Sequence, residues 1–252
     1  MQWQETSIIL STRLFSENFR RVTVFNSSHG KVSGLLRGVK VPVNRGDLSD
    51  VIWKGKTADQ LGTFIIENIF SPFVHAFNSP PEIMAIDTAC TLCYLGIPEK
   101  APHQKLYEAF KNFLFSVSRG DKYEWLKDYA FFELIFLSEV GMGLDLKKCA
   151  VTKTTENLCY VSPRTGRAVS REVGKKYHDK LFRLPEFFCN HDAEASFFDI
   201  YCALEITKHF LSIYFYGINN RELPLSRVQL LQWLENVVED QGKTYENQRN
   251  SR

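Results

Sequence analysis

The chain has 252 residues and a net charge of +2, with 44% hydrophobic and 24% charged residues, which is ordinary for a globular protein. This length can bury one large core or two smaller ones. The longest apolar runs, at 130–137 and 210–216, are too short to cross a bilayer, which excludes a membrane-spanning chain.

Charge is distributed unevenly along the chain. Residues 1–78 sum to +3, 79–144 to −3, 145–185 to +6 and 186–252 to −4. Segregated positive charge of this kind indicates an anionic partner. The first ten residues lack the pattern of a signal peptide, and the six cysteines are scattered, so we expect a cytoplasmic protein with reduced thiols.

Residues 1–70 predict β-structure. Short segments rich in β-branched and aromatic residues alternate with turns, and Gly30 supplies the positive φ of a hairpin at 27–31. A longer loop is expected over 38–50. Five strands within about 70 residues predict a small barrel, either an OB-fold or an SH3-like barrel. The expected strands are Thr6–Leu14, Arg21–Asn26, Lys31–Leu36, Val51–Trp53 and Thr63–Phe70.

After Ser79-Pro-Pro-Glu82, the apolar residues recur with the helical period of 3.6. This change predicts a domain boundary between residues 78 and 79 and an all-α domain over 79–252. Helices are expected at Glu82–Leu95, His103–Ser118 and Lys122–Val140. Asp192 is the expected N-cap of a helix that ends at Tyr216. A last helix is expected at Pro224–Val238, followed by a frayed polar tail from Glu239.

An insertion at about 144–185 interrupts this helical pattern and carries ten Lys or Arg against four Asp or Glu. Its short strand at 158–161 and its turn at 162–166 indicate a compact, knuckle-like unit. Zinc often stabilises such units, but Thr152 and Ser170 stand where cysteine ligands would be expected after Cys149. We therefore expect no metal and no other cofactor, with apolar packing by Leu158, Tyr160, Val161 and Val169 in its place.

No catalytic motif is recognisable in the sequence. Cys90-x-x-Cys93 lies inside an apolar helical stretch and is expected to fill the core, because a redox motif of this spacing needs a helix N-terminus. The first block also carries cations near its strands and loops, with Trp3, Phe15, Phe19 and Phe25 available for base stacking. The alternative is ordinary surface decoration around an aromatic core.

The segment Leu144–Cys149 followed by 156–170 resembles the knuckle of the RecO family of bacterial recombination mediators. It is similar to the branch that lacks the four cysteines. The start of the chain, with Arg13, Arg21, His29-Gly-Lys31 and Gly34-Leu-Leu-Arg-Gly38, resembles the start of the same family. The resemblance implies an α+β protein, with an N-terminal five-stranded OB-fold barrel over 1–78, then an all-α domain with the inserted small knuckle.

The resemblance also implies function. Members bind single- and double-stranded DNA, anneal complementary strands, contact the C-terminal tail of single-stranded-DNA-binding protein (SSB), and help load the RecA recombinase together with RecR. Two departures are the missing zinc ligands and a loop at 39–48 that is shorter than usual in the family, which could weaken the DNA groove. By position, the implied DNA-binding residues are Arg13, Arg20, Arg21, His29, Lys31, Arg37, Lys40 and Arg45 in the barrel, and Arg164, Arg167, Arg171, Lys175 and Lys176 in the knuckle.

Two hypotheses follow. The first is a DNA-binding and annealing mediator, in which the cations of both groups form one continuous surface for DNA. The second is a protein-interaction scaffold with incidental DNA affinity.

Overall fold

The computed structural model describes residues 1–38, 42–57, 60–119 and 124–250, the last with backbone only for 218–219 and 242–250. The chain is α+β and divides into two compact units, 1–125 and 126–252. The predicted boundary at residue 79, which separates strands from helices, stays a prediction. Among the described residues, no helix combines the length and hydrophobicity that crossing a lipid bilayer requires.

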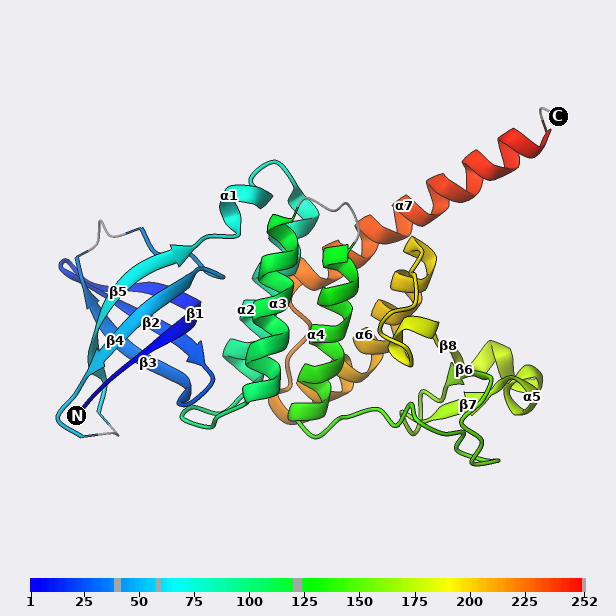
Figure 1. Ribbon diagram of the computed structural model, residues 1–252, viewed down its shortest axis with the longest axis horizontal. Helices are drawn as coiled ribbons and strands as arrows, with labels where there is room; N and C mark the ends of the chain where they lie inside the picture. Colours follow the sequence, from blue (N-terminus) through cyan, green and yellow to red (C-terminus); the bar gives the residue numbers. More distant parts are fainter. Residues whose placement is uncertain (39–41, 58–59, 120–123, 251–252) are drawn as a thin grey trace. The chain divides into compact units, whose positions relative to one another are not determined.

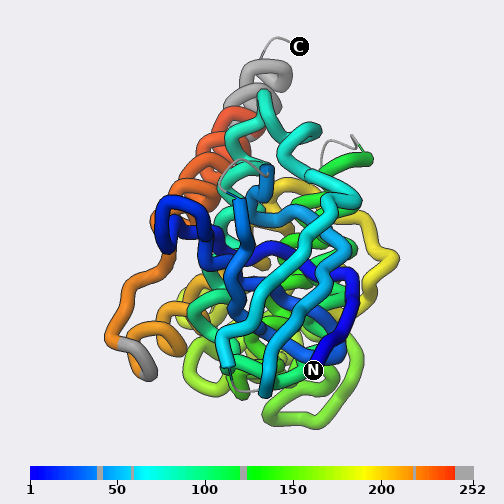
Figure 2. Tube along the Cα trace, turned by 90° about the vertical axis from the view of Figure 1, so that its left-hand side faces the viewer, coloured from blue at the N-terminus to red at the C-terminus, as the bar shows by residue number. Residues whose placement is uncertain are grey.

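Five strands form a closed barrel in the first unit (Figure 1). Each strand overlaps a predicted one and extends beyond it by one to several residues. The strand order around the barrel, β1-β2-β3-β5-β4, is that of the OB-fold. Figure 2 shows these strands in blue to cyan. Their bounds are β1 (Gln2–Ser16), β2 (Phe19–Asn26), β3 (Gly30–Arg37), β4 (Leu48–Lys54) and β5 (Gly62–Phe70).

The barrel closes through a short parallel seam between β3 and β5. Only three residue pairs form it, and the first is Gly34 opposite Gly62. A Cβ atom at Gly34 would lie 2.7 Å from the Phe64 ring, and one at Gly62 would lie 2.2 Å from Trp53 Nε1. The seam therefore needs glycine on both strands, because the two aromatic rings occupy the space of any side chain.

Three helices complete the first unit: α1 (Phe73–Ala76), α2 (Pro80–Gly96) and α3 (Gln104–Ser118). The Cys90 thiol on α2 lies 3.7 Å from the backbone oxygen of Ile9 on β1, and both Cys90 and Cys93 are fully buried. Burial raises the pKa of Cys90 to about 12. The prediction that this pair fills the core is confirmed. On α3, the Tyr107 hydroxyl donates to the Thr6 oxygen at 2.9 Å.

The second unit contains α4 (Glu124–Glu139), α6 (Phe197–Asn219) and α7 (Leu225–Asn250). The predicted N-cap Asp192 is wrong. Ser196 caps α6 instead, because it forms a reciprocal capping box with Asp199. The prediction that the last helix ends at Val238 is also wrong, since α7 continues through the polar tail.

A charged network lies in the core of the second unit. Arg227 on α7 and Glu133 on α4 are both fully buried and form an ion pair with an Nε–Oε1 distance of 2.5 Å. Thr207 on α6 and Tyr129 also donate to the Glu133 carboxylate. Three elements therefore meet at one carboxylate, which fixes their relative positions within the unit.

The knuckle, residues 144–185, is a small three-stranded sheet with two short helices. Its sheet contains β6 (Leu158–Val161), β7 (Ala168–Ser170) and β8 (Phe182–Arg183), in the order β7-β6-β8. Between β7 and β8 lie α5 (Arg171–Gly174) and the 3-10 helix η1 (Lys175–Lys180), and a second 3-10 helix, η2 (Glu186–Phe188), follows β8. The predicted strand at 158–161 and the turn at 162–166 are confirmed, and Gly166 has the positive φ that the turn needs.

Candidate nucleic-acid interface

Three arginines share the outer face of the barrel. Arg13 and Arg21 are partners in the β1–β2 register, and Phe19 faces Arg37 in the β2–β3 register. Side chains alternate along a strand, so these residues point away from Val22, which belongs to the barrel core. All three arginines are exposed. We name Arg13, Arg21 and Arg37 the barrel arginine surface.

Among the described residues, no carboxylate forms an ion pair with Arg13, Arg21 or Arg37. The guanidinium of Arg13 instead lies 5.5 Å from the centre of the Tyr94 ring. Like charges that face each other across a sheet repel, so an anion bound between Arg13 and Arg21 would relieve this repulsion.

Exposed apolar side chains adjoin the arginines at the end of β1. Leu14 is 72% exposed and Phe15 is 59% exposed. The register is irregular between Leu14 and Ser16, and such a bulge redirects side chains. A surface that binds single strands without sequence preference combines cations with exposed aromatic rings, and both are present here.

Two predicted DNA-binding cations serve the interior of the unit instead. Lys31 is 8% exposed and donates to the backbone oxygen of Tyr94 at 2.6 Å, and burial lowers the pKa of its amine. Arg45 pairs with Asp87 at 2.6 Å and donates to Thr91 at 2.6 Å. Both contacts hold the barrel to α2, so the charged groups of these side chains are engaged within the unit, and their part in DNA binding stays a prediction.

The remaining predicted barrel residues differ in their surroundings. Arg20 follows the opposite alternation from Arg21 and is partly buried. The Nδ1 atom of His29 lies 3.0 Å from a Glu5 oxygen, and its ring stacks on Trp3. Phe25 is fully buried against Tyr107, which removes it as a stacking candidate. Lys40 lies outside the described residues.

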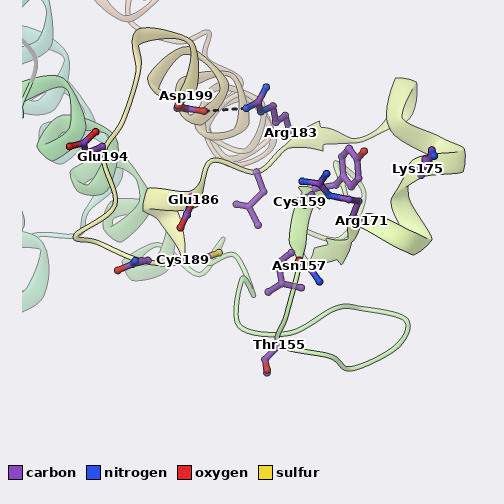
Figure 3. A pocket seen from close by; sticks show the side chains of 14 residues that line it. Thr155, Asn157, Cys159, Arg171, Lys175, Arg183, Glu186, Cys189, Glu194 and Asp199 are labelled. Carbon is purple, nitrogen blue, oxygen red and sulfur yellow. Dashed lines mark hydrogen bonds and ion pairs between the residues drawn. The ribbon is translucent and has the colours of Figure 1, made fainter.

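The knuckle presents a second set of cations. Arg164, in the turn after β6, is exposed, whereas Arg167 pairs with Asp145 at 3.5 Å. Arg171 and Lys175 line a cavity of about 970 Å³, and Arg183 lines the same cavity (Figure 3). Lys176, the last predicted cation, is exposed on η1.

The cavity of the knuckle is mixed in charge. Glu186, Glu194 and Asp199 also line it, and Asp199 lies 3.5 Å from the Arg183 guanidinium. Arg183 in turn lies over the Phe198 ring at 4.9 Å. Arg183 is not among the predicted DNA-binding residues. In the sequence, only its positive charge within a basic segment points to a role in binding.

Cys149, Thr152 and Ser170 occupy positions where zinc ligands would be expected, and they lie together in the knuckle. Only Cys149 offers a sulfur atom, whereas the other two offer hydroxyl groups. Cys149 Sγ accepts the backbone N–H of Ser170 at 3.3 Å. Burial raises the pKa of the thiol, but hydrogen bonds from the hydroxyl and backbone groups of Thr152 and Ser170 outweigh it and lower the pKa to about 6. A tetrahedral zinc does not fit one thiolate and two hydroxyls that already bond to it. Within the described residues, no cluster of three His, Cys, Asp or Glu could hold a metal.

Backbone and side-chain contacts hold this segment together. Ala150 N–H donates to Ala168 O at 2.8 Å, and Cys149 N–H donates to Thr154 O at 2.7 Å. The Tyr160 ring packs on Gly174, where an added Cβ would lie 2.3 Å from it. Val161 and Val169 are buried as predicted, whereas Leu158 and Tyr160 are partly buried.

The fold and the surface define the chain as an OB-fold protein with a helical unit and a basic knuckle. The family model "Recombination protein O N terminal" matches residues 1–71, and "Recombination protein O C terminal" matches residues 81–217. The chain therefore belongs to the RecO family, as the sequence resemblance predicted.

Curated relatives agree with this assignment. The protein "DNA repair protein RecO" of Phenylobacterium zucineum (strain HLK1) is 32% identical over 236 residues, which cover 92% of this chain and 96% of the relative. The protein of the same name from Caulobacter vibrioides (strain NA1000 / CB15N) is 33% identical over 236 residues, with the same coverage. That of Anaplasma marginale (strain St. Maries) is 35% identical over 187 residues, which cover 74% of this chain and 78% of the relative.

Proposed function

We propose that this protein is a DNA repair and recombination mediator that binds single- and double-stranded DNA and anneals complementary strands. The observation that carries the proposal is the barrel arginine surface, where three exposed arginines lie on one OB-fold face and form no ion pair with a carboxylate of the described residues. Membership of the RecO family supports it. In this role no covalent bond is made or broken.

The physical basis is charge neutralisation without sequence readout. Guanidinium groups on the outer face of the barrel contact phosphates, which position a strand but carry no sequence information. Annealing requires two polyanions to approach each other, so a surface that reads phosphates and ignores base identity suits this task. Phe15, which is 59% exposed beside these arginines, offers a stacking partner for an unpaired base.

The knuckle supplies a second contact region in this proposal. Arg164, Arg171, Lys175 and Lys176 are exposed and lie within one small sheet-and-helix unit. We assign them to a second DNA segment or strand. That they extend the barrel arginine surface into one continuous path stays a prediction, because the two groups belong to different compact units.

The protein partners of the proposal follow from the family. The acidic C-terminal tail of SSB would bind an apolar groove with flanking cations in the helical unit. With RecR, the bound protein would then help load RecA at SSB-coated gaps.

A salt series on fluorescent single-stranded DNA tests the proposal. Three phosphate contacts predict a slope of log affinity against log salt of about −2, and contacts from the knuckle would make it steeper. Double-stranded DNA should give a steeper slope still, because its counterion density is higher. Binding that is undetectable at low salt, or independent of salt, would contradict the proposal.

A second candidate, the protein-interaction scaffold, is favoured by one specific observation. Lys31, Arg45 and Arg167 are engaged within the chain, and the knuckle cavity combines three cations with three carboxylates. A mixed-charge cavity suits a folded protein partner better than a polyanion. The salt series separates the two functions, since only the mediator binds DNA strongly at low salt.

A further inference from the structure

The barrel carries a second feature, distinct from its arginine surface, at the turn between β2 and β3. Three rings stack there in series. The His29 ring lies 4.5 Å from the Trp3 ring at an interplanar angle of 14°, and Trp3 lies 6.1 Å from Trp53 at 11°. Trp53 is 3% exposed, whereas the side chain of His29 is 39% exposed. The series therefore runs from the barrel core to the surface.

A cavity of about 480 Å³ lies against these rings. Small-molecule sites span roughly 300–1,000 Å³, so this space is large enough for one small planar ligand. Its apolar lining comes from Trp3, Trp53 and Val32, and its polar lining from Gln2, Ser28 and the cation Lys100. The flat apolar walls suit a base, and the amide of Gln2 and the hydroxyl of Ser28 suit the polar groups at the edge of a base. The positive charge of Lys100 suits the phosphate of a nucleotide.

The His29 ring is held in place by a hydrogen-bond network rather than left free. Glu5 is the centre of this network. One carboxylate oxygen lies 3.0 Å from His29 Nδ1, and the other accepts from the Ser27 hydroxyl at 2.7 Å and from the Ser28 backbone at 3.1 Å. The Asn26 side chain accepts the His29 backbone N–H at 2.8 Å. A preorganised ring loses less entropy when a ligand stacks beside it.

We propose that this cavity binds one unpaired nucleobase of a single strand whose phosphates lie on the barrel arginine surface. The inference rests on the proposed function and adds a base-binding subsite to it. Arg21, near the start of β2, and Asn26, at its end, are roughly 17 Å apart along the strand. A few nucleotides cover this distance, and one OB-fold holds about 4–16 nucleotides. The subsite gives the barrel a preference for single strands, because the bases of a duplex are already stacked on each other.

The test compares an oligothymidylate of about 16 nucleotides, the upper site size of one OB-fold, with a blunt duplex of the same length. The variants are His29→Ala, which removes the ring, and His29→Phe, which keeps a ring and removes the contact with Glu5. Thermal unfolding of each variant verifies that it is folded. We expect His29→Ala to lower the ratio of single-strand to duplex affinity about tenfold, within the range for loss of one base–aromatic stack. We expect His29→Phe to lower the ratio less than His29→Ala does, because it keeps the stacking ring and loses only the contact with Glu5 that orients the ring.

A photocrosslink gives an independent readout on the wild-type chain. The same oligothymidylate with a 5-iododeoxyuridine substitution should attach to the tryptic peptide 1–13, which contains Trp3, or to the peptide 22–31, which contains His29. An unchanged ratio in His29→Ala, equal losses in both variants, or crosslinks only to other peptides would overturn the subsite and leave DNA binding intact. Absence of binding to either DNA by the wild-type protein would instead overturn the proposed function itself.

Discussion

Arg13 and Arg21 are direct partners across the antiparallel pair β1–β2, so two guanidinium groups emerge side by side from the outer face of the barrel. Arg37 lies on the same face, opposite Phe19 on β2. A cationic pair of this kind is unfavourable in isolation and favourable once an anion binds between its members. We therefore expect DNA binding to depend strongly on Arg13 and Arg21.

Replacement of both arginines by glutamate, Arg13→Glu with Arg21→Glu, should weaken binding to every DNA sequence to a similar extent. Each change removes one phosphate contact, so for each residue the salt slope should become shallower by about 0.7 on single-stranded DNA and by about 0.9 on duplex. Fluorescence anisotropy over a salt series measures both quantities. The matched control is Lys105→Glu, which reverses an exposed charge at the start of α3. An equal loss in the control would show that net charge, rather than this surface, governs binding.

Phe15→Ala should weaken binding to single-stranded DNA with little effect on duplex. Base–aromatic stacking contributes about 1–3 kcal/mol per base, and the exposed ring has little packing to lose on replacement. Phe77→Ala is the control, because Phe77 is 80% exposed and lies outside the strands. The idea fails if both variants bind single strands like the wild type, or if Phe15→Ala weakens duplex binding equally.

The Cys149 thiol predicts a pH-dependent stability. Its folded pKa of about 6 lies below its ordinary value of 9.0, because Thr152 and Ser170 donate hydrogen bonds to the thiolate against the effect of burial. The thiolate therefore adds stability that is fully present above pH 9 and is lost as the pH falls towards 6. Thermal unfolding of Cys149→Ser relative to wild type, between pH 6 and 9, measures this difference.

Cys202→Ser is the control for the Cys149 experiment. Burial raises the pKa of Cys202 to about 11, so its ionisation does not contribute between pH 6 and 9. Its replacement should change the unfolding temperature by the same amount at each pH. A Cys149→Ser variant whose loss of stability is also constant with pH would show that the thiol is protonated in the folded protein.

The buried pair of Glu133 and Arg227 predicts strongly coupled stability effects. Arg227→Met leaves a buried carboxylate without its partner, which costs about 3–5 kcal/mol, and Glu133→Gln leaves an unpaired guanidinium with a similar cost. The double variant should lose less than the two single losses combined, because no isolated charge then remains buried. Urea unfolding gives these values. Additive losses would contradict the assignment of the ion pair.

The sequence predicted the strands well because β-branched and aromatic residues between turns favour extended backbone, as in Val22, Val24 and Phe25 on β2. The start of α6 was missed although its signal is local. Ser196 and Asp199 have the spacing of a capping box, whereas residue type alone favours Asp192 as the cap. The extension of α7 was missed because a polar tail has no apolar stripe.

The binding surface was only partly predictable, for a different reason. Arg21 and Lys31 have the same charge and lie on adjacent strands, yet one is exposed and the other is buried. The partner of Lys31 is the backbone oxygen of Tyr94, which is 63 positions away. The partner of Arg45, Asp87, is 42 positions away. Residue type and local spacing carry no information about such contacts, so the sequence could identify cations but not select the available ones.

The glycine pair of Gly34 and Gly62 determines where the barrel is weakest. Three parallel residue pairs hold β3 to β5, whereas β1 and β4 share seven antiparallel ones. Local opening begins where the fewest cooperative bonds must break, so backbone amides along this junction should exchange with deuterium before those of the other strand pairs. The missing side chains at Gly34 and Gly62 let the barrel close, and they also make the β3–β5 seam the place where local opening should begin.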